Sequence, residues 1–386
     1  MRPQFDPKGW IHWPDNEDFS TEFMRLLGAA QESGSTVSEC FLTASRIDPH
    51  DEESWFREWK KTADASIERG DRALARGHFL TAQSNWLRGT NYYNAAIFPL
   101  DCSDDRRQTV LPTMRACARR YLKHRAPAGS VVEIPWLEGY PLEGYFLPAA
   151  NAPSPTPVII CIGEPGHRKE EYLYKMTRYA GERGIALLAV DLLGSGTGAD
   201  FDHVVGRRDL ETSVSHIMDY LTTRDDVDKS RIAIHGDSSG SFVARGVALD
   251  DRFAAAVCDG GIWDLQEREF LNKRIVSRDA EVFSGPEYGR ASSSLKCPVL
   301  ITIGEHGWLE ADHVSGLFAQ IKSDQPDVTL KIFRAADTAA SQGHIDNPTL
   351  ANEFIFDWLS SRLRIDAGSR KSLLDRWEAV LAHVEQ

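Results

Sequence analysis

Arg231-Ile-Ala-Ile-His-Gly-Asp-Ser-Ser-Gly240 is a short stretch that combines a strand pattern with a serine flanked by glycines. Three β-favouring residues lie at 232–234, and a helical pattern follows over residues 242–249. A G-x-S-x-G motif between a strand and a helix is typical of a nucleophile elbow, a strained turn that lifts the serine hydroxyl clear of a sheet. We therefore predict Ser238 as a nucleophile; the plainer interpretation is a glycine-rich loop with an exposed serine.

Strand-like and helix-like segments alternate on both sides of this stretch. The pattern predicts strands at residues 158–162, 185–190, 232–234, 254–258, 299–303 and 330–333, with a hairpin-like pair before them at 131–136 and 144–147. Such alternation favours an α/β protein with a doubly wound, mostly parallel sheet. Chemistry in such sheets lies at the carboxyl ends of the strands.

The first 125 residues carry almost no strand signal and instead show apolar residues at helical spacing. We expect a helical N-terminal domain over residues 1–125, an α/β core over 126–365 and an amphipathic C-terminal helix over 366–386. Trp86, Tyr92 and Tyr93 are candidates for lining a substrate pocket from the helical domain. Aromatic side chains on helices are, however, more often part of a core.

Composition limits the classes of function. The 386 residues carry a formal net charge of −13, which argues against binding to nucleic acids or anionic membranes. The six cysteines show no metal-binding or disulfide pattern, and no run is long and apolar enough for a membrane span. We expect a cytoplasmic protein that acts on a small molecule and needs no metal or other cofactor.

A serine nucleophile needs a base, and His344 fits that role. In this order of elements the histidine follows the last strand, and His344 lies about ten residues after the pattern at 330–333. His306 and His313 are the competitors, whereas His235 falls inside a predicted strand and is more easily explained as a packed residue. The oxyanion donors are predicted to be the backbone amides of Ser239 and Glu164.

The acid of the expected triad is the difficult position. A carboxylate is usual three residues after Gly304, and Gly307 stands there instead. Asp264 is our choice for the acid; the alternatives, all on loops after neighbouring strands, are Asp259, Glu305, Glu310 and Asp312. The question matters because loss of a triad acid costs on the order of 10⁴-fold in turnover.

Taken together, these features resemble a family of α/β-hydrolases with a helical N-terminal domain. It includes 2,6-dihydroxypseudooxynicotine hydrolase, the fungal polyketide-shortening hydrolases and the fermentation-respiration switch protein group. The resemblance rests on Trp59, residues 86–96, Gly163, residues 169–171, residues 190–196, the elbow, Gly260-Gly261 and His344. It implies the α/β-hydrolase fold, a homodimer, and an active site between the helical domain and the core.

The same resemblance implies hydrolysis of a carbon–carbon bond next to a ketone, in a β-diketone, acyl-aromatic or polyketide-type substrate. Ser238 would be the nucleophile and His344 the base. Three alternatives stay open. An esterase or thioesterase would use the same residues, whereas a non-hydrolytic cyclase or isomerase of secondary metabolism would use only the pocket and the oxyanion site, as the glycine at 307 would allow. A non-enzymatic binding protein is the third.

Overall fold

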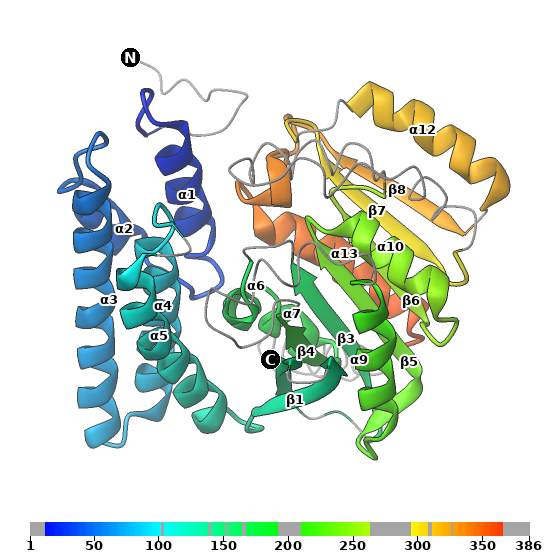
Figure 1. Ribbon diagram of the computed structural model, residues 1–386, viewed down its shortest axis with the longest axis horizontal. Coiled ribbons are helices and arrows are strands. Elements are labelled where there is room, and N and C mark those ends of the chain that lie inside the picture. The colour runs from blue at the N-terminus through cyan, green and yellow to red at the C-terminus, as the bar shows by residue number, and fades with distance from the viewer. Residues whose placement is uncertain are drawn as a thin grey trace, which may run out of the picture.

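The computed structural model describes residues 12–101, 104–137, 140–150, 152, 154–163, 167–191, 210–262, 295–307, 311–325 and 327–365. Five helices form one body at the side of a twisted sheet that is covered by helices on both faces (Figure 1). The predicted helix at 366–386 lies outside the described residues, and the predicted domain boundaries stay predictions.

The N-terminal part of the chain is helical, as predicted. Its elements are α1 (Glu17–Gly28), α2 (Val37–Ala44), α3 (Glu52–Ala75), α4 (Phe79–Ala96) and α5 (Asp105–His124). Side chains of Asn16, Thr36, Asp51 and Asp104 cap α1, α2, α3 and α5, which explains where these helices begin. Trp55 and Trp59 are fully buried between the helices, so the aromatic stripe of α3 forms the core of this region.

The sheet has eight strands in the order β1-β2-β4-β3-β5-β6-β7-β8. They are β1 (Ser130–Leu137), β2 (Tyr140–Leu147), β3 (Thr156–Gly163), β4 (Ala186–Val190), β5 (Val227–Asp237), β6 (Ala255–Asp259), β7 (Val299–Gly304) and β8 (Val328–Phe333). The first two form the expected antiparallel hairpin, and β3 to β8 are mutually parallel. This is the doubly wound, mostly parallel sheet that the alternating pattern predicts, and it has the α/β-hydrolase arrangement that the family resemblance implies.

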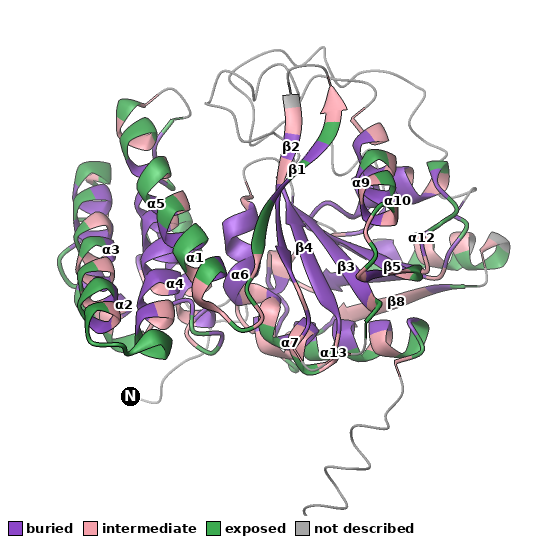
Figure 2. Cartoon of the chain, turned by 90° about the horizontal axis from the view of Figure 1, so that it is seen from below, coloured by how far each residue is buried: buried purple, intermediate pink, exposed green. Residues whose placement is uncertain are grey.

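Helices cover both faces of the sheet, and its central strands β3, β4, β6 and β7 are buried, whereas the edge strand β1 has exposed residues (Figure 2). Ile160 and Ile234 pack toward α9 (Thr212–Thr222), α10 (Gly240–Leu249) and α12 (Ala311–Asp324). Their neighbours Ile159 and Ala233 pack toward α7 (Thr177–Glu182) and α13 (Pro348–Arg362). Alternate residues of each strand thus enter two different cores, which explains the continuous apolar runs in the sequence.

The last residue of α1 and the turn after it touch the chain just beyond His344. A Cβ atom at Gly28 would lie 2.5 Å from the backbone oxygen of Ile345. Thr349 donates its hydroxyl to Gln31 and Glu32 at 2.6 and 2.9 Å. The helical region is therefore in direct contact with the loop that carries the predicted base.

Two kinds of feature are not found among the residues described above. No helix is both long and apolar enough to cross a lipid bilayer. No group of three or more histidine, cysteine, aspartate or glutamate side chains is arranged to hold a metal ion.

Candidate active site

The chain makes the predicted strand, turn and helix around Ser238. β5 ends at Asp237 and α10 begins at Gly240, while Ser238 itself has a φ of 54°, in the left-handed region. A Cβ at Gly236 would lie 2.6 Å from Val243 Cγ2, and one at Gly240 would lie 2.7 Å from the carbonyl carbon of Cys258. Only glycine fits these two places, because the strained turn brings neighbouring backbone so close.

His344 lies in the short helix η4 (Gln342–His344), after β8, and is buried. Its backbone also has a left-handed φ, of 56°. Nδ1 lies 2.7 Å from the backbone oxygen of Ala339, and Nε2 lies 2.9 Å from Asp259 Oδ1. Both partners are acceptors, so this arrangement suits an imidazole that carries a proton on each nitrogen.

Asp259, at the end of β6, is the carboxylate that the fold brings to His344. Its side chain is almost completely buried. Oδ1 accepts a hydrogen bond from the Thr302 hydroxyl at 2.8 Å, and Oδ2 accepts one from the backbone N–H of Ser238 at 3.2 Å. One carboxylate therefore contacts the elbow, the histidine and β7 together.

Burial and charge act in opposite directions on this pair. Burial alone would raise the pKa of Asp259, but the neighbouring positive charge and hydrogen bond of His344 outweigh it and hold that pKa well below its usual range. Burial alone would lower the pKa of His344, but Asp259 and the Ala339 carbonyl outweigh it and raise that pKa. Each group thus favours the charged form of the other.

Ser238 and His344 are adjacent without a hydrogen bond between their side chains. A Cβ at Gly343 would lie 3.3 Å from Ser238 Oγ, so the backbone just before His344 reaches the nucleophile. The Gln342 amide nitrogen lies 3.5 Å from the same oxygen. For His344 to act as a base, its ring has to turn and present a neutral nitrogen to Oγ.

The other acid candidates are placed differently. Glu305 is partly exposed; it accepts hydrogen bonds from Arg334 at 2.9 Å and from the Ala335 N–H at 2.7 Å, so its carboxylate serves the end of β8. Asp312 lies exposed in the first turn of α12. Asp264, our choice from the sequence, and Glu310 lie outside the described residues. Of the candidates that the structure describes, Asp259 is the one at His344.

The predicted oxyanion site is described in part. Ser239 is the N-cap of α10 and is buried, with its hydroxyl 3.2 Å from the backbone oxygen of Ile162. Glu164 lies outside the described residues. Gly163, just before it, pairs in register with Asp237, so the loop after β3 starts beside the elbow. A helix N-terminus at this point favours negative charge.

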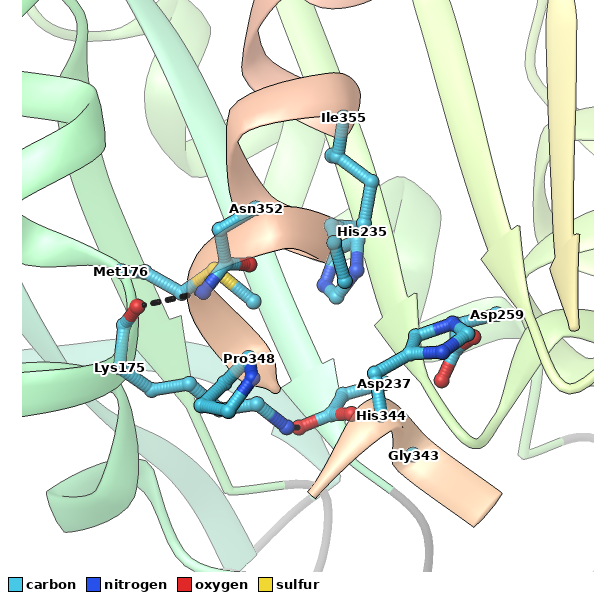
Figure 3. A pocket seen from close by; sticks show the side chains of 11 residues that line it. Lys175, Met176, His235, Asp237, Asp259, Gly343, His344, Pro348, Asn352 and Ile355 are labelled. Atoms are coloured by element: carbon cyan, nitrogen blue, oxygen red, sulfur yellow. Dashed lines mark hydrogen bonds and ion pairs between the residues drawn. The ribbon is translucent and has the colours of Figure 1, made fainter. Parts of the chain in front are cut away.

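A small cavity lies beside His344. Its lining includes Lys175, His235, Asp237, Asp259 and Asn352 (Figure 3). Lys175 Nζ lies 2.5 Å from Asp237 Oδ2, which pairs the two buried charges. His235 is packed, as predicted, and burial lowers its pKa. The sequence does not indicate the Lys175–Asp237 pair, because no motif links a lysine on a helix to the aspartate before the nucleophile.

The three aromatic candidates for substrate binding are core residues in the structure. Trp86, Tyr92 and Tyr93 are buried, and none lines the cavity beside His344. Trp86 donates to Asp71 at 2.9 Å, Tyr92 to Glu39 at 2.7 Å and Tyr93 to Asp64 at 2.5 Å. Because each polar atom is already paired inside the helical region, the structure favours the core interpretation, and a part in substrate binding stays a prediction.

Comparisons with known proteins agree with this architecture. Residues 48–272 match the model of the esterase FrsA-like family. Hydrolyase poxO of Penicillium oxalicum is 31% identical over 316 residues, which cover 79% of this chain and 69% of that protein. The 20-hydroxy-prefusarin hydrolase FUS2 of Gibberella moniliformis is 32% identical over 253 residues, covering 63% and 60%. The crystal structure of 2,6-dihydroxy-pseudo-oxynicotine hydrolase superposes with a TM-score of 0.70 at 21% identity, over 87% of this chain and 95% of that one.

Proposed function

Because the chain belongs to the esterase FrsA-like family and is an enzyme of the α/β-hydrolase type, we propose that it uses Ser238 and His344 to hydrolyse a carbon–carbon bond next to a ketone. Its substrate would be a small β-diketone, acyl-aromatic or polyketide-type molecule. The observation that carries the proposal is the Asp259 carboxylate, 2.9 Å from His344 Nε2 and 3.2 Å from the Ser238 N–H.

That carboxylate supports full hydrolytic turnover. Gly307 leaves the usual acid position empty of charge, but a carboxylate at the end of the neighbouring parallel strand can hold the histidine equally well. A buried aspartate next to the imidazole keeps one ring tautomer and stabilises the imidazolium that forms during the reaction.

The reaction begins with attack of Ser238 Oγ on the ketone carbon. The hydroxyl proton passes to the neutral His344, and the carbonyl oxygen becomes an alkoxide. The Ser239 amide at the start of α10, together with the Glu164 amide, would donate hydrogen bonds to that oxygen. Asp259 would stabilise the imidazolium in this step.

Collapse of the alkoxide then breaks the carbon–carbon bond. The bonding electron pair leaves on the neighbouring carbon as a resonance-stabilised enolate, which takes its proton from the His344 imidazolium. The acyl group stays on Ser238 as an ester. Water, deprotonated by the neutral histidine, hydrolyses this ester and releases a carboxylic acid, so both products are accounted for.

The relatives support this substrate class. The fungal relative FUS2 is named for the hydrolysis of 20-hydroxy-prefusarin, and the superposed crystal structure is that of a hydrolase of 2,6-dihydroxy-pseudo-oxynicotine. We extend to this chain the class of small, resonance-stabilised organic substrates. A homodimer, which the family resemblance implies, is part of the same proposal and is tested by light scattering of the purified protein.

Replacement of Ser238 tests the proposal. The Ser238→Ala variant is expected to lose turnover of acyl-phenols and β-diketones by at least about 10⁴-fold. It should also lose covalent labelling by a fluorophosphonate probe, with an unchanged thermal unfolding midpoint. Equal turnover by the variant and the wild type would refute a serine mechanism.

An esterase is the second candidate, favoured by the description of the matched family. The two functions differ in their leaving groups, since an ester expels an alkoxide and a diketone expels an enolate. The ratio of kcat/KM for a p-nitrophenyl ester and for a matched acyl-phenone decides between them. A strong preference for the ester, with no cleavage of any ketone, would replace the carbon–carbon hydrolase by an esterase.

A further inference from the structure

The Gln342 side chain lies between the nucleophile and the position where the acid was expected. Its amide nitrogen is 3.5 Å from Ser238 Oγ. Its amide oxygen faces Gly307, where a Cβ would lie 3.0 Å away from it. Gly307, at the expected acid position, and Gln342, next to the nucleophile, are therefore neighbours.

Glycines surround the amide. A Cβ at Gly307 would meet the oxygen at one end, and a Cβ at Gly260 would lie 3.7 Å from the nitrogen at the other. Gly260 also has a left-handed φ of 82°, which disfavours any larger residue there. The Cβ of an aspartate at 307 would lie 3.0 Å from both the Gln342 amide oxygen and the Gly304 backbone oxygen, so the amide would have to shift.

The loop that carries Gln342 is held firmly in place. The His306 N–H donates to the Ala340 oxygen at 2.8 Å, and a Cβ at Gly304 would lie 2.5 Å from the Ser341 oxygen. The Asp346 carboxylate accepts hydrogen bonds from two successive backbone N–H groups, those of Ala340 and Ser341, at 3.0 Å each. The backbone that carries the amide is thus fixed before any substrate binds, which limits the reorganisation needed for an electrostatic contribution to catalysis.

We propose that Gln342 is a further catalytic residue, whose amide donates to Ser238 Oγ, and that Gly307 is a glycine because it makes room for this amide. The proposal rests on the role of Ser238 given above. A donor on Oγ orients the hydroxyl and stabilises the negative charge that grows there as its proton leaves. The resting distance is long, as such contacts often are before substrate binds, and shortens during the reaction.

A neutral amide suits this place better than a carboxylate. A carboxylate 3.5 Å from a forming alkoxide would repel it, whereas the amide donates at any pH at which the protein is folded. The acid function has its own site at Asp259, 2.9 Å from His344 Nε2. The carboxylate is therefore Asp259 at the end of β6, whereas Gly307 in the loop after β7 leaves space for the Gln342 amide.

Two substitutions of Gln342 test the proposal, with the second-order rate of fluorophosphonate labelling as the readout. Gln342→Met keeps the length of the side chain and removes the donor, and we expect labelling about 10- to 100-fold slower than in the wild type. Gln83→Met is the matched control, because the Gln83 amide donates to the His124 oxygen within the helical region. Its labelling rate should equal that of the wild type.

Gln342→Glu keeps the shape and adds a titratable group. As a neutral acid it can donate to Oγ, but as a carboxylate it cannot, so its labelling relative to the wild type should fall as the pH rises through the pKa of the new carboxyl. This pH-dependent ratio also serves if the methionine variant does not fold. A rate for Gln342→Met equal to the wild type, or a Gln342→Glu ratio independent of pH, would overturn the role of Gln342. If the wild-type protein itself is not labelled at Ser238, the proposed function fails instead.

Discussion

Two clusters of buried charge stand in contrast in this molecule. In the first, Lys169 Nζ is fully buried, 2.6 Å from Asp191, 3.1 Å from Glu143 and 3.6 Å from Glu170. In the second, His344 and Asp259 meet beside Ser238. Both lie at the ends of strands, and both hold a cationic group that is almost completely buried.

The difference between them is in the backbone. Lys169 begins the short helix η1 (Lys169–Glu171), and the residues of its cluster have ordinary φ values. The second cluster combines Ser238, His344 and Gly260, all with left-handed φ. Burial and charge alone therefore do not mark an active site, because a structural ion-pair cluster has both. Strained backbone next to a buried charge is the more selective sign.

Asp259→Asn should have the largest effect in the second cluster. Asparagine keeps the size of the side chain but cannot stabilise the imidazolium, so we expect kcat to fall by about 10³- to 10⁴-fold. Steady-state turnover and fluorophosphonate labelling measure it, and circular dichroism checks folding. Activity within tenfold of the wild type would mean that the acid lies elsewhere, with Asp264 the first position to test.

Lys169→Met should break the first cluster without touching the chemistry. Removing the cation leaves buried carboxylates unpaired, and we expect a loss of about 3–5 kcal/mol in the free energy of unfolding. Urea denaturation measures this loss. In the folded fraction the rate of Ser238 labelling should stay at the wild-type value. A strongly reduced rate would mean that Lys169 takes part in catalysis and that the first cluster is not purely structural.

The pH dependence separates the two clusters again. His344 must be neutral to act as a base, and its pKa is raised above the ordinary 6.5, so kcat/KM should rise with pH along a limb above 6.5. In Asp259→Asn that limb should move to lower pH by about one unit or more, since a charge partner lowers or raises a pKa by that amount. In Lys169→Met it should not move.

Stability follows from the same shifts with the signs worked out. The raised pKa of His344 stabilises the fold at pH below 6.5, and this contribution disappears as pH rises through the folded-state value. The lowered pKa of Asp259 stabilises it above 3.8, and this is lost as pH falls through the folded-state value. The pair therefore contributes most to the free energy of unfolding between pH 3.8 and pH 6.5. In Asp259→Asn the dependence of that free energy on pH should be flatter.

Glu305→Gln should have the smallest effect. Its carboxylate is paired with Arg334 near the end of β8 and does not reach the histidine. We expect kcat/KM within about twofold of the wild type, since exposed ion pairs contribute little. A loss similar to that of Asp259→Asn would show that the loop after β7 supplies the acid after all.

Much of the fold could be predicted from the sequence because it rests on local signals. Apolar runs at 158–162 and 299–303 are long enough for buried parallel strands, and the elbow motif identifies the turn between β5 and α10. Capping residues such as Asp51 and Asp104 lie where helices begin. These features depend on residues only a few positions apart, so they can be predicted from local sequence patterns.

The acid could not be chosen in the same way. Asp259 was one of five candidates, and its selection depends on β6 lying beside β5 and on the Thr302 hydroxyl and Ser238 N–H that orient it. The Gln342 contact depends on a loop conformation and on the absence of a side chain 35 positions earlier, at Gly307. The same holds for Trp86, because only the three-dimensional structure shows its indole paired with Asp71.

The contact at Gly28 means that the helical region and the sheet region cannot be separated without loss. The obvious place to divide the chain is between α5 and β1, yet the last residue of α1 and the turn after it lie against the Ile345 oxygen, one residue beyond His344, and against Thr349. A chain starting at β1 would keep every strand of the sheet but would lose one wall of its histidine loop. Exchange of helical regions between relatives would therefore have to match the residues at 28–32 to those at 345–349, so the two regions are expected to diverge together rather than as independent parts.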